Sequence, residues 1–385
     1  MQSELHQRAL DTLRRGDANN ALIMLGQALQ LGESSELWND WAATSYRLQR
    51  LKEAELGFRR ALQLDAKNSA AAANLSSLLE HARLSEETRR DATIRKNLKE
   101  QLERLYAQPA KPQRAGRNLV MGTATNYGKK ELGPFVSSLR RSGFLGDIVL
   151  FVSELDRETQ QFLAAHAVKT ELWDGMFLPF DVQLGRFITY YNFLQRMSRG
   201  PDQPYDYVFL TDVRDVLFQQ DPFSPEPKSD MLAFLEDDSQ SLGSCVFNSN
   251  WIRSAFGEAE LGKVAAERIS CSGTVLGSWR GILAYLLTMQ IMITEMPRPT
   301  RFIKGIDQGL HNVMLSRQLL RSCDKVRNGE RVLTLGYVAE QNVRINDEGK
   351  IVDPNGHVIP VIHQYDRHPK VAGLMEKALE VTVSR

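Results

Sequence analysis

Two features that would mark a secreted or a nucleic-acid-binding protein are missing from this sequence of 385 residues. The three cysteines, Cys245, Cys271 and Cys323, are widely spaced, which argues against a disulfide framework or a zinc ribbon and indicates a reducing compartment. Lys plus Arg (48) nearly balance Asp plus Glu (47). This balance leaves no basic field to favour nucleic acid or an anionic membrane as the main partner.

Long hydrophobic runs are also scarce. Residues 1–16 lack the apolar core of a signal peptide, and the apolar segment 282–296 is shorter than the roughly 20 residues that span a bilayer. We interpret 282–296 as a buried helix, and we expect a cytoplasmic protein without a transmembrane segment. The chain is longer than one hydrophobic core usually supports, so we expect two domains.

The first 107 residues have the composition of helices. Ala, Leu, Gln, Glu and Arg dominate, and glycine and proline are rare within the periodic stretches. The segment Asn20–Leu31 returns 33 positions later as Glu53–Leu64, with an alanine, a large apolar residue and a second alanine in register. A repeat of this length predicts stacked helical hairpins.

The repeat resembles the tetratricopeptide pattern, whose period is about 34 residues. The positions that match its two helices are Trp38, Trp41 and Ala42 in the first and Ala54, Phe58 and Ala61 in the second. We expect residues 1–107 to form such an array, with a third, degenerate unit over Ser69–Leu105 ending in a capping helix; a non-repetitive helical bundle is the alternative. The resemblance implies a surface that binds a protein or glycan acceptor or a partner protein, or else a dimerisation element.

Beyond residue 107 the pattern changes. Residues 108–117 are polar, contain two prolines and are predicted to form a linker. From 118 to 385 we predict an α/β domain with a doubly wound, mostly parallel sheet, because apolar β-runs alternate with helical segments. The predicted strands are 118–125, 147–153, 168–173 and 205–210, and the predicted helices are 133–142, 157–166 and 182–197. Such sheets bind ligands beyond the carboxyl ends of their strands.

Two aspartates follow the fourth predicted strand, within the segment YDYVFLTDVRDVLFQQDPF at 205–223. Asp212 and Asp215 stand where a buried strand ends, and carboxylates there need a compensating cation. Hard oxygen ligands favour Mg²⁺ or Mn²⁺. Residues i and i+3 of a strand face opposite sides, so both aspartates reach one ion only if the chain bends at Val213–Arg214.

This strand with its aspartates resembles the DxD region of glycosyltransferases with the A-type (GT-A) fold, although DVRD is one residue wider. The resemblance implies a metal on the nucleotide diphosphate, with Asp215 as the better ligand and Asp212 binding metal, a water or the ribose. Three later segments resemble family motifs in the family's order. Ser270–Gly277 is similar to the family's "N-x-G-v" strand, in which Ser272 and Gly273 would line the sugar pocket. Ile306–Asn312 is similar to the "DQD-x-L-N" segment of glycogenin-like and retaining galactosyltransferases. Val361–His368 is similar to the "H-F-x-G" segment, which implies His363 as third metal ligand.

The resemblance implies metal-dependent transfer of a sugar, most simply a hexose, from a nucleotide-diphosphate sugar, with a UDP-sugar favoured and with retention of configuration. Asp307 and Gln308 would lie beside the anomeric carbon. The nucleotide sugar would be bound by Arg186 and Tyr190 on the donor-facing helix, by Thr123, Thr125, Asn126 and Tyr127 after the first strand, and by Arg367 or Lys370, which are displaced from the family's phosphate-binding position.

Each of these assignments has an ordinary structural alternative. His363 could be a merely hydrogen-bonded histidine, Asp307 and Gln308 a helix N-cap pair, Arg186 a surface side chain on Tyr190, and residues 123–127 a polar turn. An inverting enzyme would need a carboxylate base, for which Asp307 or residues 236–238 could serve. The alternative function is a catalytically inactive adaptor with a transferase fold. A nucleotidyltransferase would need a glycine-rich basic loop, which residues 123–130 hardly supply.

Overall fold

The computed structural model describes residues 1–108, 117–173, 182–198 and 204–373. The chain forms two compact units, Met1–Thr93 and Ile94–Arg385. Residues 109–116 of the predicted linker lie outside the described residues.

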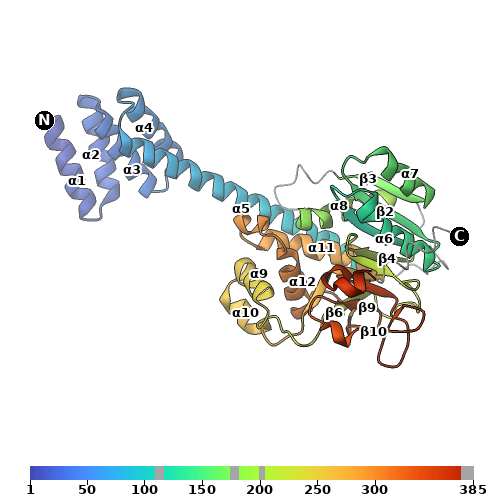
Figure 1. Cartoon of the computed structure of the whole chain (residues 1–385). Coiled ribbons are helices and arrows are strands. Elements are labelled where there is room, and N and C mark those ends of the chain that lie inside the picture. Colours follow the sequence, from blue (N-terminus) through green and yellow to red (C-terminus); the bar gives the residue numbers. More distant parts are fainter. Residues whose placement is uncertain (109–116, 174–181, 199–203, 374–385) are drawn as a thin grey trace. The chain divides into compact units, whose positions relative to one another are not determined.

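The first unit is all-helical (Figure 1). Its first four helices are α1 Gln2–Arg14, α2 Ala18–Leu31, α3 Ser35–Arg47 and α4 Leu51–Leu64. Successive helices pack against one another. The carboxylate of Asp17 caps α2 and the hydroxyl of Ser34 caps α3, each accepting a bond from a backbone amide three residues on. These caps fix where the helices begin.

The repeated small and aromatic residues lie between helices α3 and α4. Ala54, Phe58 and Ala61 are buried, and a Cβ atom added at Gly57 would lie 2.8 Å from the Cβ of Ala42. The small residues therefore allow α3 and α4 to approach closely, which is the packing that the repeat predicts. The assignment of these helices to the tetratricopeptide family stays a prediction.

The expected third repeat is wrong in form. Residues Ser69–Ala107 make a single 39-residue helix, α5, rather than a hairpin. No glycine or proline interrupts this stretch, so nothing in the sequence ends a helix there. From Ile94 on, α5 belongs to the second unit, because Leu98 is buried in that unit's core and Arg95 donates to the Thr294 carbonyl oxygen. The division between the units thus falls inside α5, ahead of the expected boundary at residue 107.

A seven-stranded sheet forms the centre of the second unit, in the order β3-β2-β1-β4-β7-β6-β8. Its strands are β1 Asn118–Ala124, β2 Asp147–Val152, β3 Val168–Leu172, β4 Tyr207–Thr211, β6 Met231–Leu235, β7 Ser270–Ser278 and β8 Cys323–Val326. Only β7 runs antiparallel to its neighbours, β4 and β6. The predicted mostly parallel sheet is confirmed.

Both faces of this sheet are covered. Successive residues of β1 alternate between two hydrophobic clusters, with Leu119 and Met121 in one and Val120 and Ala124 in the other. Besides the end of α5, the α-helices among the described residues of this unit are α6 Lys129–Arg141, α7 Arg157–Ala165, α8 Val182–Met197, α9 Val246–Phe256, α10 Glu258–Val264, α11 Trp279–Glu295 and α12 Ile306–Ser316, and the described 3₁₀ helices are η2 Arg298–Phe302, η3 Glu340–Asn342 and η4 Tyr365–Arg367. The predicted fold class, an α/β domain preceded by a helical region, is confirmed.

The apolar segment 282–296 is a buried helix, as predicted. It forms most of α11, in which residues such as Ile282, Leu286 and Met292 are fully buried. Within the described ranges, no helix combines the length and the apolar character needed to cross a bilayer.

A small second sheet pairs the segment that follows Asp215 with two strands from the C-terminal part of the unit. It has the order β5-β12-β9, with β5 Val216–Phe218, β9 Val332–Thr334 and β12 Val361–His363. His363 pairs with Val216 on one side and with Thr334 on the other. Strands β10 Arg344–Ile345 and β11 Ile351–Val352 form a separate hairpin. The pairing of β12 with β5 places His363 beside the chain that follows Asp215.

Candidate active site

The two aspartates occupy a turn between β4 in the main sheet and β5 in the small one. The strand ends at Thr211, and the chain turns through Val213 and Arg214 before β5 begins at Val216. This is the bend that the DVRD spacing requires if both carboxylates are to face one point. The amide of Asp212 donates to the Gly273 carbonyl oxygen at 2.7 Å, and the amide of Gln364 donates to the Asp215 carbonyl oxygen at 2.7 Å, so both ends of the turn are fixed.

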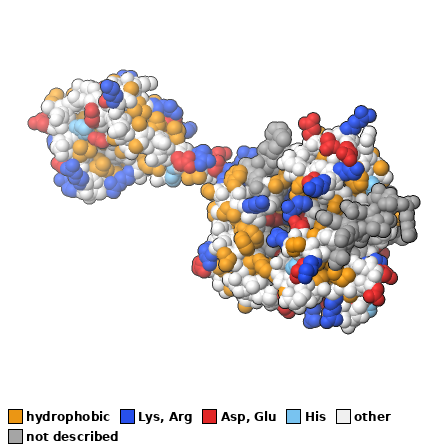
Figure 2. All heavy atoms as spheres, in the orientation of Figure 1, with side chains coloured by type: hydrophobic (Ala, Val, Ile, Leu, Met, Phe, Trp, Pro, Cys, Tyr) orange, Lys and Arg blue, Asp and Glu red, His pale blue; other side chains and the backbone are white. Residues whose placement is uncertain are grey.

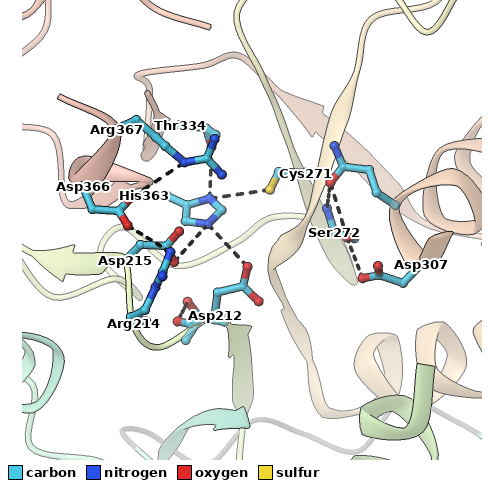
Figure 3. Close-up of polar contacts among 12 residues, drawn as sticks. Asp212, Arg214, Asp215, Cys271, Ser272, Asp307, Thr334, His363, Asp366 and Arg367 are labelled. Carbon is cyan, nitrogen blue, oxygen red and sulfur yellow. Dashed lines mark hydrogen bonds and ion pairs between the residues drawn. The ribbon is translucent and has the colours of Figure 1, made fainter. Parts of the chain in front are cut away.

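The imidazole of His363 faces both carboxylates (Figure 3). Its Nε2 lies 3.5 Å from Oδ2 of Asp212 and 3.8 Å from Oδ1 of Asp215. Ligand atoms of the three residues all lie within 4.8 Å of one another. The three residues that were predicted from the sequence as metal ligands therefore lie together in the structure.

This cluster fits a divalent cation. His363 is fully buried, yet its Nε2 has no hydrogen-bond partner among the described residues. Octahedral ligands at about 2.1 Å from an ion lie about 3 Å apart. The distances of 3.5 and 3.8 Å from Nε2 of His363 to the two carboxylates are somewhat longer, so the side chains would have to close around the ion. Gly273 borders the same space, since an added Cβ would lie 2.3 Å from Oδ2 of Asp212 and 3.1 Å from Cε1 of His363. Two carboxylates and one imidazole suit Mn²⁺ or Mg²⁺.

Burial and neighbouring charges shift the pKa values of the three residues in this cluster. Burial opposes the charged form of Asp212, but Arg186 and His363 outweigh it and lower the pKa of this carboxyl to about 2. Burial raises the pKa of Asp215. Burial also opposes protonation of His363, yet Cys271, Asp212 and Asp215 together hold the pKa of the imidazole well above its usual value. A cation that binds here must therefore displace a proton.

Arg186 links the metal cluster to the second group of candidate residues. From α8, its Nη1 donates to Asp212 and its Nη2 donates to Asp307, each at 2.6 Å. The side chain of Asp307 is 5% exposed, and burial raises its pKa even though Arg186 faces it. Asp307 stands in the first turn of α12 rather than at its N-cap, which is Gly305. A surface role for Arg186 and an N-cap role for Asp307 are therefore both wrong.

The sugar-pocket candidates form a hydrogen-bonded row beside Asp307. The hydroxyl of Ser272 donates to Asp307 at 3.0 Å, and its amide donates to Oε1 of Gln308 at 3.2 Å. The amide nitrogen of Gln308 donates in turn to Glu236 at 2.9 Å. Burial raises the pKa of Glu236. Hydrogen bonds thereby connect Glu236, which follows β6, with Gln308 of α12 and Ser272 of β7.

The predicted nucleoside-binding residues lie at the end of β1 (Thr123) or directly after it (Thr125, Asn126 and Tyr127), at the same sheet edge as the end of β4. The hydroxyls of Thr123 and Tyr190 are hydrogen bonded at 2.8 Å. Asn126 has a left-handed backbone, φ 61°, and its amide donates to Ser153. Thr125 is half-buried in the same turn. Burial raises the pKa of Tyr127, and the charges of Arg214, Asp215 and Asp212 act on the same phenol, so it lies near the acidic turn.

The two displaced phosphate-binding candidates are in different surroundings. Arg367, in η4, lies 3.9 Å from Asp366, which is also paired with Arg214. Its charge reaches the site, since it acts to lower the pKa of Glu236 against the effect of burial. Lys370 instead faces Glu340 at 3.9 Å, and its amide donates to the same carboxylate. The structure thus brings Arg367, but not Lys370, to the candidate site.

Sequence reasoning missed two side chains that contact His363. The Sγ of Cys271 and the hydroxyl of Thr334 each lie 3.5 Å from Nδ1, on the ring edge opposite the carboxylates (Figure 3). They leave Nε2 directed at the acids. Thr334 lies beside His363 because β9 pairs with β12 in this register. No local feature of the sequence predicts that pairing. Cys271 stands where the resembled motif has asparagine, and that departure was its signal.

Similarity to known proteins is found among solved structures. No family model matches the chain, and no curated protein matches its sequence. Among solved structures, the chain is similar to the galactosyltransferase LgtC in complex with donor and acceptor sugar analogs. The TM-score is 0.42 and the identity 13%, over 67% of this chain and 95% of that one.

Proposed function

We propose that the second unit is a glycosyltransferase that takes a sugar from a nucleotide-diphosphate sugar, with a UDP-linked hexose favoured. One observation carries the proposal. Asp212, Asp215 and the unused Nε2 of His363 converge at the carboxyl end of β4, and Arg186 joins this cluster to the buried Asp307. Parallel sheets bind their ligands at this edge.

The metal-binding end of the site would hold the diphosphate. Asp215 and His363 would bind the cation, while Asp212 either completes the coordination or binds the ribose. Bound Mn²⁺ or Mg²⁺ would supply neutralising charge for the departing diphosphate. Arg186 would orient the phosphate or the sugar, and the exposed Arg367 would provide a further cation for the phosphates.

The other end would hold the sugar. Asp307 and Gln308 would stand beside the anomeric carbon, where bond cleavage develops positive charge. The hydrogen bonds of Gln308 to Ser272 and Glu236 fix its amide, so this group would be held in place before the donor binds. Thr123, Thr125, Asn126 and Tyr127 would bind the base and ribose, and Tyr190 would support them through Thr123. We propose retention of configuration, with the acceptor attacking from the face that the diphosphate leaves.

The helical first unit would bind the acceptor or a partner protein, and cytoplasmic location remains part of the proposal. The alternative is an inactive adaptor, which the widened DVRD spacing and the altered phosphate-binding segment after His363 both favour. The turn at Val213–Arg214 removes the first of these reasons, because it brings both carboxylates to His363.

Hydrolysis of nucleotide sugars by the purified full chain tests the proposal. With Mn²⁺ present, we expect slow release of UDP from at least one UDP-hexose, abolished by Asp215→Ala. The matched control is Asp347→Ala, which removes an exposed carboxylate in the turn between β10 and β11 and should leave turnover unchanged. Absence of turnover with every common nucleotide sugar, together with no thermal shift on adding UDP and Mn²⁺, would favour the adaptor.

A further inference from the structure

The position of the ring proton decides whether the imidazole of His363 can bind a cation. A cation can bind Nε2 only when that nitrogen carries no proton, and the neutral ring then keeps its one proton on Nδ1. The ring is fully buried, and its Nδ1 faces Cys271 and Thr334. A buried N–H group needs an acceptor, so one of these two side chains has to accept the bond from Nδ1.

Cys271 is the better acceptor of the two. Its Sγ and the hydroxyl of Thr334 both lie 3.5 Å from Nδ1 (Figure 3). An N–H···O bond is usually shorter than about 3.2 Å, so the contact to the hydroxyl oxygen is long. Sulfur is the larger atom, and the same distance is ordinary for a bond to a thiol. A thiol has only one proton, so Sγ is free to accept from Nδ1 if its own S–H group points elsewhere.

The carboxylate of Glu236 lies where it can accept that S–H bond. Glu236 is 4% exposed, and its backbone amide donates to the Ile269 carbonyl oxygen at 2.8 Å. Its carboxylate accepts from Gln308, which accepts in turn from the amide of Ser272. These bonds tie Glu236 to the residues on both sides of Cys271 in the sequence. Burial raises the pKa of Glu236, and hydrogen bonds from Gln308 and from the Cys271 thiol act in the opposite direction.

The direction of these bonds follows from the backbone. A backbone amide can only donate, so the amide of Ser272 fixes the oxygen of the Gln308 side chain and turns its nitrogen to Glu236. Glu236 is therefore an acceptor for its neighbours. With the thiol proton on that carboxylate, the lone pairs of Sγ are left for the Nδ1–H group of His363.

The state of His363 matters because the other sources of attraction for a cation are limited. Arg186 lies 2.6 Å from Asp212 and already offsets much of the charge of that carboxylate. Acidic and basic side chains are intermixed on the face of the second unit that Figure 2 shows. A bound cation would therefore depend strongly on a correctly oriented imidazole.

We propose that Cys271 and Glu236 are positioning residues for the metal cluster: Glu236 orients the thiol, and the thiol keeps the ring proton of His363 on Nδ1. The inference rests on the proposed function, because it concerns the cation that would bind there. Without an acceptor at Nδ1, the neutral ring would carry its proton on Nε2, which lies 3.5 Å from Asp212, and the cation would have to displace it. Loss of groups that orient a metal-binding histidine typically reduces metal affinity about 10- to 100-fold.

Titration of the full chain with Mn²⁺, followed by electron paramagnetic resonance, tests the role of the thiol. The titration is done without donor, above the pH at which the affinity of the wild-type chain stops changing. Cys271→Ala should bind Mn²⁺ at least about tenfold more weakly than the wild type. Cys323→Ala is the matched control, because Cys323 pairs with Met231 at the start of β6, the end opposite Glu236, and its loss should leave the affinity unchanged.

A double-mutant cycle separates orientation of the thiol from simple loss of charge. Glu236→Gln keeps the size of the side chain and should also weaken Mn²⁺ binding. If Glu236 acts through Cys271, the same substitution in the Cys271→Ala background should change the affinity less than about twofold. Equal fold-changes in both backgrounds would show an effect of charge alone and would overturn the proposal.

A serine variant and the melting temperatures separate hydrogen bonding from packing. Cys271→Ser keeps a donor and an acceptor, so it should bind Mn²⁺ more tightly than Cys271→Ala. Equal losses in the two variants, or wild-type affinity in Cys271→Ala, overturn the positioning role and leave the glycosyltransferase proposal standing. If the wild-type chain binds no Mn²⁺ with or without UDP, the proposed metal-dependent function fails as well.

Discussion

Substitution of Gly273 by alanine should disable the metal cluster without unfolding the protein. The added methyl group would lie 2.3 Å from Oδ2 of Asp212, far inside van der Waals contact, and 3.1 Å from the ring of His363. The carboxylate must move, because the imidazole belongs to β12 and is fully buried. Its other oxygen is held by Arg186 at 2.6 Å, so the movement also disturbs that ion pair.

The expected size follows from the role of Asp212. Displacing groups that orient metal ligands typically reduces metal affinity or activity about 10- to 100-fold, and here a ligand itself moves, so we expect at least the upper value. The assay is titration of Mn²⁺ followed by electron paramagnetic resonance, with UDP release as the second readout. Gly133→Ala is the control, because no heavy atom of the described chain lies within 4 Å of its added Cβ and the residue is in α6. An unchanged Mn²⁺ affinity in Gly273→Ala would refute the reasoning.

Three further predictions concern other parts of the molecule. Arg186→Gln leaves Asp307 buried without its counter-charge, so chemical denaturation should show a loss of about 3–5 kcal/mol, and a loss below about 1 kcal/mol would show the pair to be unimportant. Because the pKa of His363 is raised, the metal-free imidazole holds its proton to higher pH, and Mn²⁺ affinity should rise as pH rises and this proton is lost. Calorimetry in buffers of different ionisation enthalpy should detect proton release on Mn²⁺ binding, and no release would contradict a protonated His363. Phe58→Ala should destabilise the helical unit by about 3–5 kcal/mol, visible by circular dichroism, and should leave Mn²⁺ binding intact because that side chain belongs to a separate core.

The sheet and its edge could be predicted from the sequence because their signals are local. The β-runs that became β1, β2 and β4 are continuous and apolar, as strands buried on both faces must be. Strand β3, at the edge of the sheet, is mostly exposed and mixes polar with apolar residues. The helix predicted at 182–197 has those bounds in the structure. Once the strands were known, topology placed the residues after β1 and β4 at one edge.

The grouping of Asp212 and Asp215 with His363 was predicted from the order of motifs, not from spacing. The DVRD spacing by itself left open whether both acids face one point, and the answer depends on β5 leaving the main sheet to pair with β12. That pairing joins residues far apart in the chain. It is set by tertiary packing, which local propensity does not determine.

Other contacts could not be predicted from the local sequence for the same reason. The partners of Nδ1 of His363 follow from strand register, and the pairing of Lys370 with Glu340 depends on the path of the chain after β9. The helix α5 shows the opposite error. Its sequence is uniformly helical, and an expected repeat length suggested a division that no helix-breaking residue provides.

The central proposal is that Asp215 and His363, with Asp212 beside them, bind one divalent cation. Anomalous X-ray diffraction from a crystal of the full chain grown with Mn²⁺ and UDP tests it most directly. The account predicts a single manganese peak within bonding distance of Nε2 of His363 and of a carboxylate oxygen of Asp215, adjacent to the diphosphate. A bound diphosphate with no manganese at this cluster, or with manganese ligated elsewhere, would contradict it.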